Sequence, residues 1–508
     1  MEVTIKKALI SVYHKNNLDT ILTLLHENNV QLYSTGGTEA HIRSLGIPVE
    51  TVENLTSYPA ILGGRVKTLH PKVFGGILNR TSEQHDQDEL AQYEIPNFDL
   101  VIVDLYPFEN TVQSGAGNQE IIEKIDIGGI SLIRAAAKNY NDVLVVAAQQ
   151  QYGNLQALLE KKGAQSTLEE RQWFASHAFA VSSHYDTQIF RYFNQTAKLP
   201  LFRESRNTSR ELRYGENPHQ QARYYGDLSA MLEQLNGKEL SYNNLVDVES
   251  AVRLISEFEE DDPAFAIIKH TNACGMATGS SVKEAYEKAF AADTLSAFGG
   301  ILACNTTVNH EAALAMHSLF FEVLIAPDFD PEAFNLLKGK KNRILLKMKS
   351  PMEAGKTFKT LLNGVIEQDS DAQTDSETDL KVVTSRAATR EEVAAMLFGS
   401  KVCKHTKSNT IVLAKNGQLL ASGVGQTSRV DALKQAIDKA GRFGFDLTGA
   451  VMVSDAFFPF KDSVEVAQEA GITAVLQPGG SKRDQESIDF CDKHGMAMVF
   501  TGIRHFLH

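Results

Sequence analysis

The first 150 residues alternate short apolar runs with segments of helical periodicity. Residues 8–12, 31–34, 100–103 and 143–146 have the length and apolar content of strands, and residues 18–26 repeat apolar side chains at helical spacing. Strands that are separated by helices run parallel in one sheet, because each helix carries the chain back to the same edge. This alternation predicts an α/β fold with a parallel sheet that is covered by helices on its faces.

Composition and charge argue against several classes of protein. The 508 residues are 43% hydrophobic and 22% charged, which is ordinary for a globular protein of about three domains. The formal net charge of −13, with no long basic block, argues against a nucleic-acid or anionic-membrane surface. The chain opens on a strand pattern and no run reaches the ~18 apolar residues of a membrane span, so we expect a cytoplasmic protein. The four cysteines lie far apart without a C-x-x-C pair, so we expect neither a disulfide framework nor zinc.

A polar stretch at residues 198–210, which contains Pro200, divides the chain. Linkers between domains commonly have this composition. We therefore predict one domain over residues 1–198 and a second region over residues 199–508.

The second region contains two segments with parallel layouts. The tripeptide Lys269-His-Thr271 returns as Lys404-His-Thr406, and a strand pattern and a helix pattern accompany each copy. We interpret the segments, residues 211–366 and 380–508, as two modules of a diverged internal duplication. Residues 367–379 between them carry six acidic and no basic side chains, which predicts a solvated loop.

Lys269 and His270 follow the apolar run 264–268, at the predicted carboxyl end of a strand. Open α/β sheets hold their ligands at that edge. A neutral imidazole can accept a proton near pH 7, and an adjacent ammonium can stabilise negative charge or protonate a leaving nitrogen. A single histidine is more often a packing or surface residue. The repeated tripeptide and the surrounding loop residues favour catalysis here.

Two N-terminal loops have the composition of anion sites. Thr35-Gly-Gly-Thr38 joins a predicted strand to a predicted helix, where backbone N–H groups and two hydroxyls can surround a phosphate. Such turns are also common without a ligand. The loop 63–71 is more specific, because it gathers Arg65, Lys67 and His70 in an acidic protein, which indicates a bound anion.

A series of motifs follows the order that is known from one enzyme family. They are Ser34-Thr-Gly-Gly-Thr38, Gly64-Arg-Val-Lys-Thr-Leu-His-Pro71, Leu105-Tyr-Pro-Phe108, Ile125-Asp-Ile-Gly-Gly129, Ala135-Ala-Ala-Lys-Asn139, Leu212-Arg-Tyr-Gly215, Asn217-Pro-His-Gln220, Lys407-Ser-Asn409, Ser454-Asp-Ala-Phe-Phe-Pro-Phe460 and Thr501-Gly-Ile-Arg-His-Phe506. With these motifs the chain resembles, over almost its whole length, the bifunctional purine biosynthesis enzymes that join phosphoribosylaminoimidazolecarboxamide formyltransferase to IMP cyclohydrolase.

The resemblance implies a fold, two reactions and an assembly. It implies a methylglyoxal-synthase-like parallel-sheet domain that closes the purine ring, then a transformylase half of two cytidine-deaminase-like modules without zinc. The reactions would be formyl transfer from 10-formyltetrahydrofolate to the 5-amino group of the ribotide AICAR, and dehydrative closure of the product FAICAR to IMP. The assembly would be a homodimer with transformylase sites between its subunits. The sequence leaves open whether a structural potassium ion binds near Asp455.

In the transformylase half, the resemblance assigns catalysis to Lys269, His270 and Asn409. The 5-amino group of AICAR is a poor nucleophile, because its lone pair is delocalised, so a base must take its proton as it attacks. His270 suits that role, while Lys269 and the Asn409 amide would stabilise the oxyanion and protonate the departing folate nitrogen. By family correspondence the ribotide would contact Arg213, Tyr214, Gly299, Glu322, Arg429, Phe457 and Arg504, and the folate would contact Val430, Asp462, Ser481 and Lys482.

In the cyclohydrolase domain, the resemblance assigns Lys67, Tyr106, Asp126 and Lys138, with Lys138 as proton donor or acceptor. Ring closure needs orientation and proton transfer more than covalent help from the protein. A lysine in that role needs a pKa lowered by burial or by a cationic neighbour such as Lys67; alternatively, Lys138 is a surface residue at a helix end. The nucleotide would contact Ser11, Tyr13, His14, Lys15, Thr35, Gly36, Gly37, Thr38, Arg65, Val66, Thr68, Asp104 and Ile127.

The chain departs from the family pattern at a few positions. Tyr13 and His14 stand where the family commonly has Ser and Asp, and Phe74 stands where many members have His. Leu507 replaces a basic residue near the C-terminus. Because of the first three changes, the sequence does not determine which residues contact the phosphate in the cyclohydrolase pocket.

Two alternative functions belong to other classes of protein. The N-terminal domain could be a phosphometabolite-sensing module, which would bind IMP without turnover. The second half could be a folate-binding scaffold with an idle catalytic pair, although the presence of Lys269, His270 and Asn409 together disfavours this interpretation.

Overall fold

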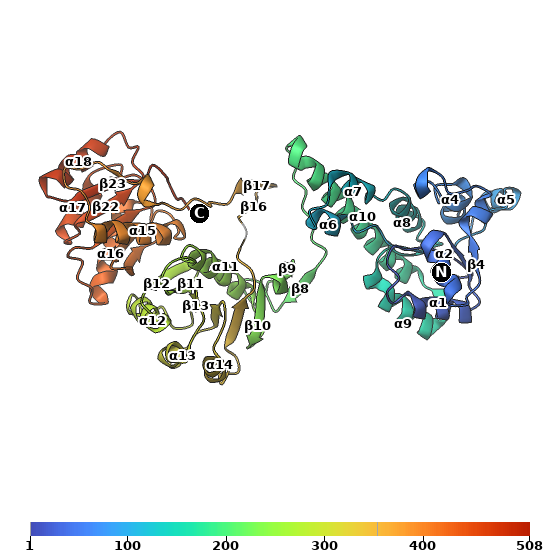
Figure 1. The fold of residues 1–508 in the computed structure, drawn as a ribbon, viewed down its shortest axis with the longest axis horizontal. Coiled ribbons are helices and arrows are strands. Elements are labelled where there is room, and N and C mark those ends of the chain that lie inside the picture. The colour runs from blue at the N-terminus through green and yellow to red at the C-terminus, as the bar shows by residue number, and fades with distance from the viewer. Residues whose placement is uncertain (1, 353) are drawn as a thin grey trace. The chain divides into compact units, whose positions relative to one another are not determined.

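The computed structural model describes residues 2–352 and 354–508, and the chain forms two compact units, Met1–Thr208 and Ser209–His508 (Figure 1). No helix formed by these residues is long and apolar enough to cross a membrane.

The first unit is built on a five-stranded parallel sheet, which confirms the prediction from the alternating pattern. Its strand order is β4-β3-β2-β5-β6. The strands are β2 (Lys7–Ser11), β3 (Gln31–Ser34), β4 (Val49–Thr51), β5 (Leu100–Val103) and β6 (Leu144–Val146); a separate pair joins β1 (Val3–Thr4) to β7 (Gln165–Ser166). Because the five strands are parallel, their carboxyl ends lie at one edge, and the loops that follow β2, β3 and β5 leave the sheet together.

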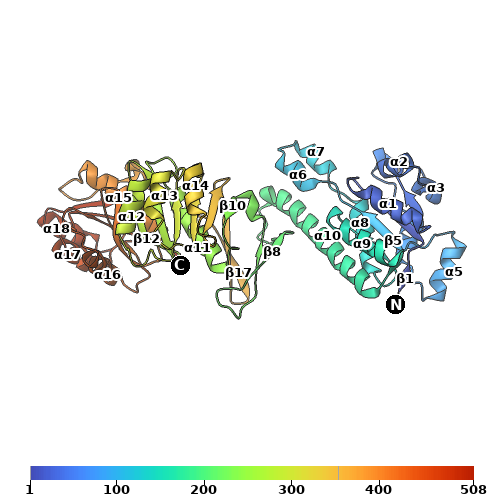
Figure 2. The same cartoon turned by 90° about the horizontal axis from the view of Figure 1, so that it is seen from below.

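Helices cover both faces of this sheet. The ribbon shows helices around this sheet (Figure 2). One core contains side chains of α1 and α9, and the other contains side chains of α4, α8 and α10. The helices are α1 (Leu18–Glu27), α2 (Gly36–Ser44), α3 (Val52–Thr56), α4 (Pro71–Leu78), α5 (Gln84–Gln92), α6 (Phe108–Gln113), α7 (Asn118–Glu123), α8 (Gly128–Lys138), α9 (Tyr152–Lys162) and α10 (Leu168–Ala197), with short 3-10 turns at Leu62–Gly64 and Gln149–Gln151. A capping box formed by Thr167 and Glu170 starts α10, because each side chain accepts a bond from the other's backbone N–H.

The second unit is built on one twelve-stranded mixed sheet. The strand order is β10-β15-β14-β13-β11-β12-β20-β19-β21-β22-β23-β18. The strands are β10 (Leu232–Asn236), β11 (Ala264–Lys269), β12 (Asn272–Thr278), β13 (Ile301–Cys304), β14 (Val323–Ala326), β15 (Ile344–Met348), β18 (Lys381–Val382), β19 (Ile411–Lys415), β20 (Gln418–Gly423), β21 (Val451–Ser454), β22 (Ala474–Gln477) and β23 (Ala497–Phe500). Two antiparallel pairs lie outside this sheet, β8 (Ser209–Leu212) with β9 (Ala222–Tyr225), and β16 (Lys356–Leu361) with β17 (Gly364–Asp369).

The two halves of the large sheet repeat one topology. In each half an antiparallel hairpin is followed by a strand that pairs antiparallel with its first member, then by two parallel strands, and an antiparallel strand closes the outer edge. We call β10–β15 with α11–α14 the first module and β18–β23 with α15–α18 the second module. They meet where β12 pairs with β20 at Ala277 and Gln418. The predicted internal duplication is therefore present in the fold.

Helices cover both faces of the large sheet as well. One continuous core runs under α11 and α15 of both modules, while α12–α14 and α16–α18 cover the opposite face in two separate cores. The helices are α11 (Tyr242–Ser256), α12 (Val282–Ala291), α13 (His310–Met316), α14 (Pro331–Leu337), α15 (Arg390–Lys404), α16 (Arg429–Arg442), α17 (Asp462–Glu469) and α18 (Asp484–Lys493), with 3-10 turns at Leu228–Ala230 and Glu377–Asp379.

The repeated tripeptide is not part of this duplication. Lys269 ends β11 and begins the turn to β12, whereas Lys404 ends helix α15, before β19. The turn that corresponds to His270 and Thr271 in the second module is Asn416-Gly417. The two copies of Lys-His-Thr therefore lie at different points of the repeat, and that part of the sequence interpretation was wrong.

The acidic segment between the modules is not a solvated loop throughout. Asp375 is 6% exposed, and its Oδ2 accepts a hydrogen bond from Ser400 Oγ at 2.5 Å. Thr374 Oγ1 donates to Glu257 at 2.5 Å, and His505 Nδ1 lies 2.7 Å from Asp371 Oδ2. The segment thus contacts both modules. Its carboxylates and its hydroxyl form hydrogen bonds with buried polar groups, which would otherwise lose their hydration without compensation.

Candidate active sites

The carboxyl edge of the five-stranded sheet gathers most residues that were predicted for the cyclohydrolase. Asp104 follows β5 directly and accepts hydrogen bonds from the backbone N–H groups of Tyr13 and His14, the latter at 3.0 Å. The His14 ring Nδ1 lies 2.8 Å from the same carboxylate. Asp104 therefore holds the loop after β2 in place. Two of the residues that depart from the family pattern, Tyr13 and His14, take part in this contact.

Two lysines approach the start of helix α2. Lys15 Nζ donates to the carbonyls of Val12 and Tyr13, both at 2.8 Å. A Cβ on Gly36 would lie 3.5 Å from Lys67 Nζ, and one on Gly37 would lie 3.8 Å from Lys15 Nζ. Burial lowers the pKa of Lys15, Asp104 opposes that shift, and the charge of Lys67 adds to it. Two ammonium groups at a helix N-terminus, with bare backbone between them, form a site suited to phosphate.

Thr38 and Ser34 fix the loops around that anion site. Thr38 Oγ1 accepts from the N–H of Val12 at 3.1 Å and donates to its carbonyl at 2.9 Å. Ser34 Oγ donates to the carbonyl of Ile10 at 2.7 Å. Thr35 Oγ1 donates to Glu53 at 2.7 Å. These hydroxyls are therefore engaged by the protein, and the backbone of Gly36 and Gly37 is the part of the motif left for a ligand.

Asp126 and Tyr106 lie close together at the start of helix α8. Asp126 Oδ1 accepts from the N–H of Gly129 at 2.6 Å. Burial raises the pKa of Asp126 despite the backbone N–H groups that favour its charged form, and Asp104 raises it further. Burial and then the Asp126 charge raise the pKa of Tyr106. The rings of Tyr13 and Tyr106 meet edge to face with centroids 5.5 Å apart. Two weakly acidic groups thus lie beside the loop after β2.

Tyr185 is a site residue that the sequence did not reveal. It belongs to α10, and its hydroxyl accepts the N–H of Asp126 at 2.9 Å while it donates to the carbonyl of Lys124. Lys124 Nζ in turn lies 5.6 Å from the centroid of the Tyr13 ring. No local motif announces this contact, because it joins segments that are 59 residues apart. A cavity of about 200 Å³ between α6 and α10 is lined by His14, Tyr106, Pro107, Phe108, Glu109, Asn110, Tyr185 and Gln188.

The remaining cyclohydrolase residues are distributed unevenly. Thr68 lies against Gly128, where a Cβ would approach its Oγ1 to 3.1 Å. Ile127 is 59% exposed, and Arg65 forms an ion pair with Glu123. Ser11 is the last residue of β2, and Val66 precedes Lys67 in the chain, so both border the same loops. Lys138 is exposed at the far end of α8; ten residues of helix separate it from Gly128, a rise of about 15 Å. Lys138 therefore lies at the opposite end of α8 from Gly128.

In the second unit, the Lys269–His270 pair lies at the turn of the β11–β12 hairpin. His270 has φ +52° and Thr271 has φ +64°, so two non-glycine residues adopt left-handed conformations in succession. Lys269 Nζ donates to the carbonyl of Phe298 at 2.8 Å, and the N–H of Thr271 donates to Asp247 at 2.7 Å. Strain of this kind concentrates at functional sites. The turn therefore presents an exposed imidazole on a firmly held backbone.

The structure brings Asn409 toward that turn. Asn272 Nδ2 donates to the carbonyl of His270 at 2.8 Å, and its Oδ1 accepts the N–H of Lys407 at 3.5 Å. Asn409 Nδ2 donates to the carbonyl of Gln426 at 2.9 Å. The loop 407–409 and the His270 turn are thus neighbours, although more than 130 residues separate them.

Arg429 anchors a second group of predicted residues beside this loop. It starts α16, and its guanidinium donates to Asp455 at 2.9 Å and to Ser454 Oγ at 3.2 Å. The N–H of Thr410 donates to Asp455 at 3.3 Å. Arg504 and Arg429 lie 4.4 and 5.6 Å from the centroid of the Phe506 ring. The C-terminal segment therefore closes over the start of α16.

The residues predicted for the folate surround the helix starts of the second module. Val430 is in the first turn of α16, Asp462 opens α17, and Ser481 and Lys482 precede α18. The N–H of Ser481 donates to Asp484 at 3.0 Å. These segments follow β20, β21 and β22, so helix starts and strand ends converge here as they do in other ligand-binding α/β sheets.

The remaining ribotide residues belong mainly to the first module and the hairpin before it. Gly299 has φ +75°, and its N–H donates to the carbonyl of Phe320 at 2.8 Å, while Glu322 forms an ion pair with Lys238 at 2.6 Å. Arg213 stacks on Tyr214 with 4.9 Å to the ring centroid. In the second module Phe457 is 39% exposed. Gly299 adjoins Phe298, the partner of Lys269, whereas the carboxylate of Glu322 is already neutralised.

His405 belongs to a different side-chain cluster from the His270 turn. Its Nε2 lies 2.9 Å from Glu257 Oε1, and Lys404 Nζ lies 2.7 Å from the same atom. Burial opposes the charge of Glu257, but the hydrogen bonds from His405 and Lys404 prevail and lower its pKa to about 2. The second tripeptide is thus a buried ion-pair cluster between the ends of α11 and α15. Among residues 2–352 and 354–508, no group of three or more His, Cys, Asp and Glu side chains is placed to hold a metal ion.

Comparison with known proteins identifies the family of the chain. Residues 136–439 match the family described as AICARFT/IMPCHase bienzyme, and residues 17–131 match the MGS-like domain. The bifunctional purine biosynthesis protein PurH of Bacteroides thetaiotaomicron is 59% identical over 504 residues, which cover 99% of each chain. Proteins of the same name from Aquifex aeolicus and Rhodospirillum rubrum are 47% and 45% identical, and the matches cover 99% of this chain and 100% and 99% of those proteins. The chain belongs to the AICARFT/IMPCHase bienzyme family.

Proposed function

We propose that the two reactions of this family, formyl transfer to AICAR and closure of FAICAR to IMP, take place on separate units of the chain. The observation that carries this division is the presence of two distinct sites, at the sheet edge of the first unit and at the His270 turn of the second. Residues 1–198 would form the cyclohydrolase domain, and residues 199–508 would form the transformylase region with modules at 211–366 and 380–508.

In the transformylase site, His270 takes a proton from the 5-amino group as its nitrogen attacks the formyl carbon of 10-formyltetrahydrofolate. The exposed imidazole is suited to this, because the left-handed turn projects it from the sheet and Asp247 holds the backbone behind it. Lys269 and the Asn409 amide stabilise the oxyanion, and Lys269 protonates the departing folate nitrogen. Arg429 and Arg504 offer the planar donors that bind phosphate or carboxamide oxygens.

In the cyclohydrolase site, Lys15, Lys67 and the start of α2 hold the phosphate of FAICAR. Asp126 and Tyr106 then face the base, and burial raises the pKa of the Asp126 carboxyl, which favours its use as the donor to the leaving hydroxyl. Tyr185 keeps the Asp126 loop in place. The resemblance assigns proton transfer to Lys138, but its distance along α8 favours Asp126 and Lys67 for that step.

Three further features of the family extend this proposal. The folate is a co-substrate and not a resident cofactor, and it would lie along Val430, Asp462, Ser481 and Lys482. A homodimer with transformylase sites between subunits would add residues of a second copy to the exposed His270 turn. A potassium ion near Asp455 would be structural. The small-molecule chemistry and the acidic surface fit a cytoplasmic enzyme.

Incubation of the protein with AICAR and 10-formyltetrahydrofolate tests this function directly. Tetrahydrofolate and IMP should both accumulate, whereas a sensor fused to a folate-binding scaffold would bind IMP and release neither product. A fragment cut between Lys198 and Arg210 should still convert FAICAR to IMP. In that fragment Lys67→Met should lower turnover far more than Lys138→Met; the opposite order would restore Lys138 to the proton-transfer role.

A further inference from the structure

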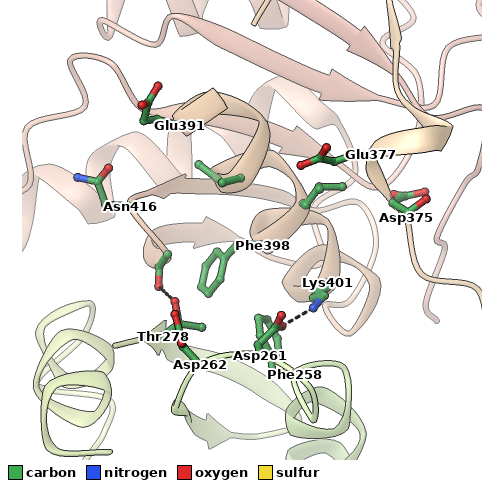
Figure 3. A pocket seen from close by; sticks show the side chains of 15 residues that line it. Phe258, Asp261, Asp262, Thr278, Asp375, Glu377, Glu391, Phe398, Lys401 and Asn416 are labelled. Carbon is green, nitrogen blue, oxygen red and sulfur yellow. Dashed lines mark hydrogen bonds and ion pairs between the residues drawn. The ribbon is translucent and has the colours of Figure 1, made fainter. Parts of the chain in front are cut away.

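A cavity of about 630 Å³ lies between the two modules of the second unit. The first module contributes Phe258, Asp262 and Thr278, and the second contributes Phe398 and Lys401 (Figure 3). Thr278 pairs with Ala264 at one end of the β11–β12 hairpin, and the His270 turn is at the other end. Five residues of strand separate these ends, about 17 Å. The cavity is therefore distinct from the transformylase site.

The cavity carries a strong excess of negative charge. Its carboxylates belong to Asp261, Asp262, Asp375, Glu377 and Glu391, and its one ammonium group belongs to Lys401. The Asp375 side chain is 2% exposed. Its Oδ2 accepts from Ser400 Oγ and lies 3.6 Å from His505 Nε2, whereas its Oδ1 is buried and accepts no hydrogen bond from the described residues. A buried carboxylate oxygen without a donor is costly, so the cavity is complementary to an added cation.

Two aromatic rings form the apolar part of the same cavity. Phe258 and Phe398 lie with their centroids 5.6 Å apart. Lys401 Nζ lies 4.7 Å from the centroid of Phe258 and forms an ion pair with Asp261 (Figure 3). The chain's own ammonium group thus shows the mode of recognition here, a cation between a carboxylate and an aromatic face.

We propose that this cavity binds a linear aliphatic polyamine. The carboxylates come from separate segments, the loop between α11 and β11, the acidic segment and α15, so they can receive ammonium groups that are spaced along one chain. The methylene groups between the charges would lie over Phe398. A polyamine in this position bridges the two modules and ties the acidic segment to both of them.

Calorimetric titration of the full-length protein with spermidine at 0.15 M NaCl tests the proposal, since that salt screens diffuse attraction to the acidic surface. We expect one saturable site per chain. The double variant Asp262→Asn/Glu377→Gln should weaken binding about tenfold or more, because both carboxylates line the cavity. Glu287→Gln on exposed α12 removes the same type of charge elsewhere and should leave the affinity unchanged. Unaltered melting temperature and IMP formation would show that the variants fold.

Competition measurements define the ligand class. Butylamine, with one charge, and Mg²⁺, with no methylene chain, should displace spermidine only at much higher concentrations. The proposal is overturned if the parent shows no saturable binding, if the double variant binds as the parent does, or if Mg²⁺ competes as well as spermidine. None of these outcomes bears on formyl transfer, which uses other residues.

Discussion

The two modules of the second unit share a topology but differ in the turn of their first hairpin. The second module uses Asn416-Gly417, both at positive φ, which is the preferred sequence for a two-residue turn of this hand. The first module makes the same turn with His270 and Thr271, one of them β-branched, where positive φ is strained. The repeat therefore has one copy whose turn sequence suits the fold and one that places the proposed catalytic residue His270 in a strained turn.

The helix ends of the two modules differ in a complementary way. Helix α11 ends beside Glu257 and helix α15 ends with Lys404 and His405, and these groups meet in one ion-pair cluster. A pair of equal charges at equivalent positions would repel across the module boundary. Divergence of the duplicated helices has thus produced an interface between the modules.

The largest expected effect concerns the strained turn. His270→Ala should lower the rate of formyl transfer by roughly 10²–10⁴-fold, as the loss of a general base does, with smaller effects on AICAR binding. IMP formation from FAICAR should be unchanged. Steady-state assays of both reactions measure this. His405→Ala, in the other tripeptide, should reduce stability but not the transfer rate of the folded protein. Equal losses of rate in the two variants would contradict the assigned difference between them.

The ion-pair cluster should matter for stability. Glu257→Gln leaves Lys404, whose side chain is 4% exposed, without its counter-charge. Breaking a buried pair from one side should cost about 3 kcal/mol of unfolding free energy. Urea unfolding of the parent and the variant measures it, with Glu287→Gln as a control for loss of a surface charge. A variant as stable as the parent would mean that water already solvates Lys404.

The same cluster predicts a pH dependence. The folded-state pKa of Glu257 is about 2, below its ordinary value of 4.5. The ion pair therefore contributes its full stability above about pH 4.5 and loses it as pH falls toward 2. Thermal unfolding across that range should show a steeper acid loss for the parent than for Glu257→Gln. Parallel curves would argue against the lowered pKa.

The smallest expected effect is relief of strain at the catalytic turn. Thr271→Gly should raise the unfolding free energy by about 1 kcal/mol, because glycine adopts positive φ without a Cβ clash while its N–H still reaches Asp247. The reciprocal change, Gly417→Thr, should destabilise the second module. Position 417 has a positive φ, which strains a β-branched residue, and the new side chain would collide with the Thr278 side chain. Urea midpoints compare the two. A destabilised Thr271→Gly protein would show that the Thr271 side chain contributes more than its backbone costs.

Local sequence was a good guide to the first unit. The strands and helices there are separated by regular periodicity, so the parallel sheet and its loop-bearing edge could be predicted. The catalytic roles of Lys67, Tyr106, Asp126 and Lys138 came from the resemblance. A motif specifies neighbours in sequence and not direction in space, so it could not reveal that Lys138 lies at the far end of α8.

By itself, the sequence determined the α/β class and the identity of the family, because these depend on periodicity and on ordered motifs. Tertiary structure alone decided that the duplicated topology does not include the second tripeptide, that Tyr185 supports Asp126, and that Asp371, Thr374 and Asp375 partner buried groups. Each of these depends on contacts between segments far apart in the chain. Such contacts are set by how strands and helices pack around a shared core, and no local pattern of residues encodes them.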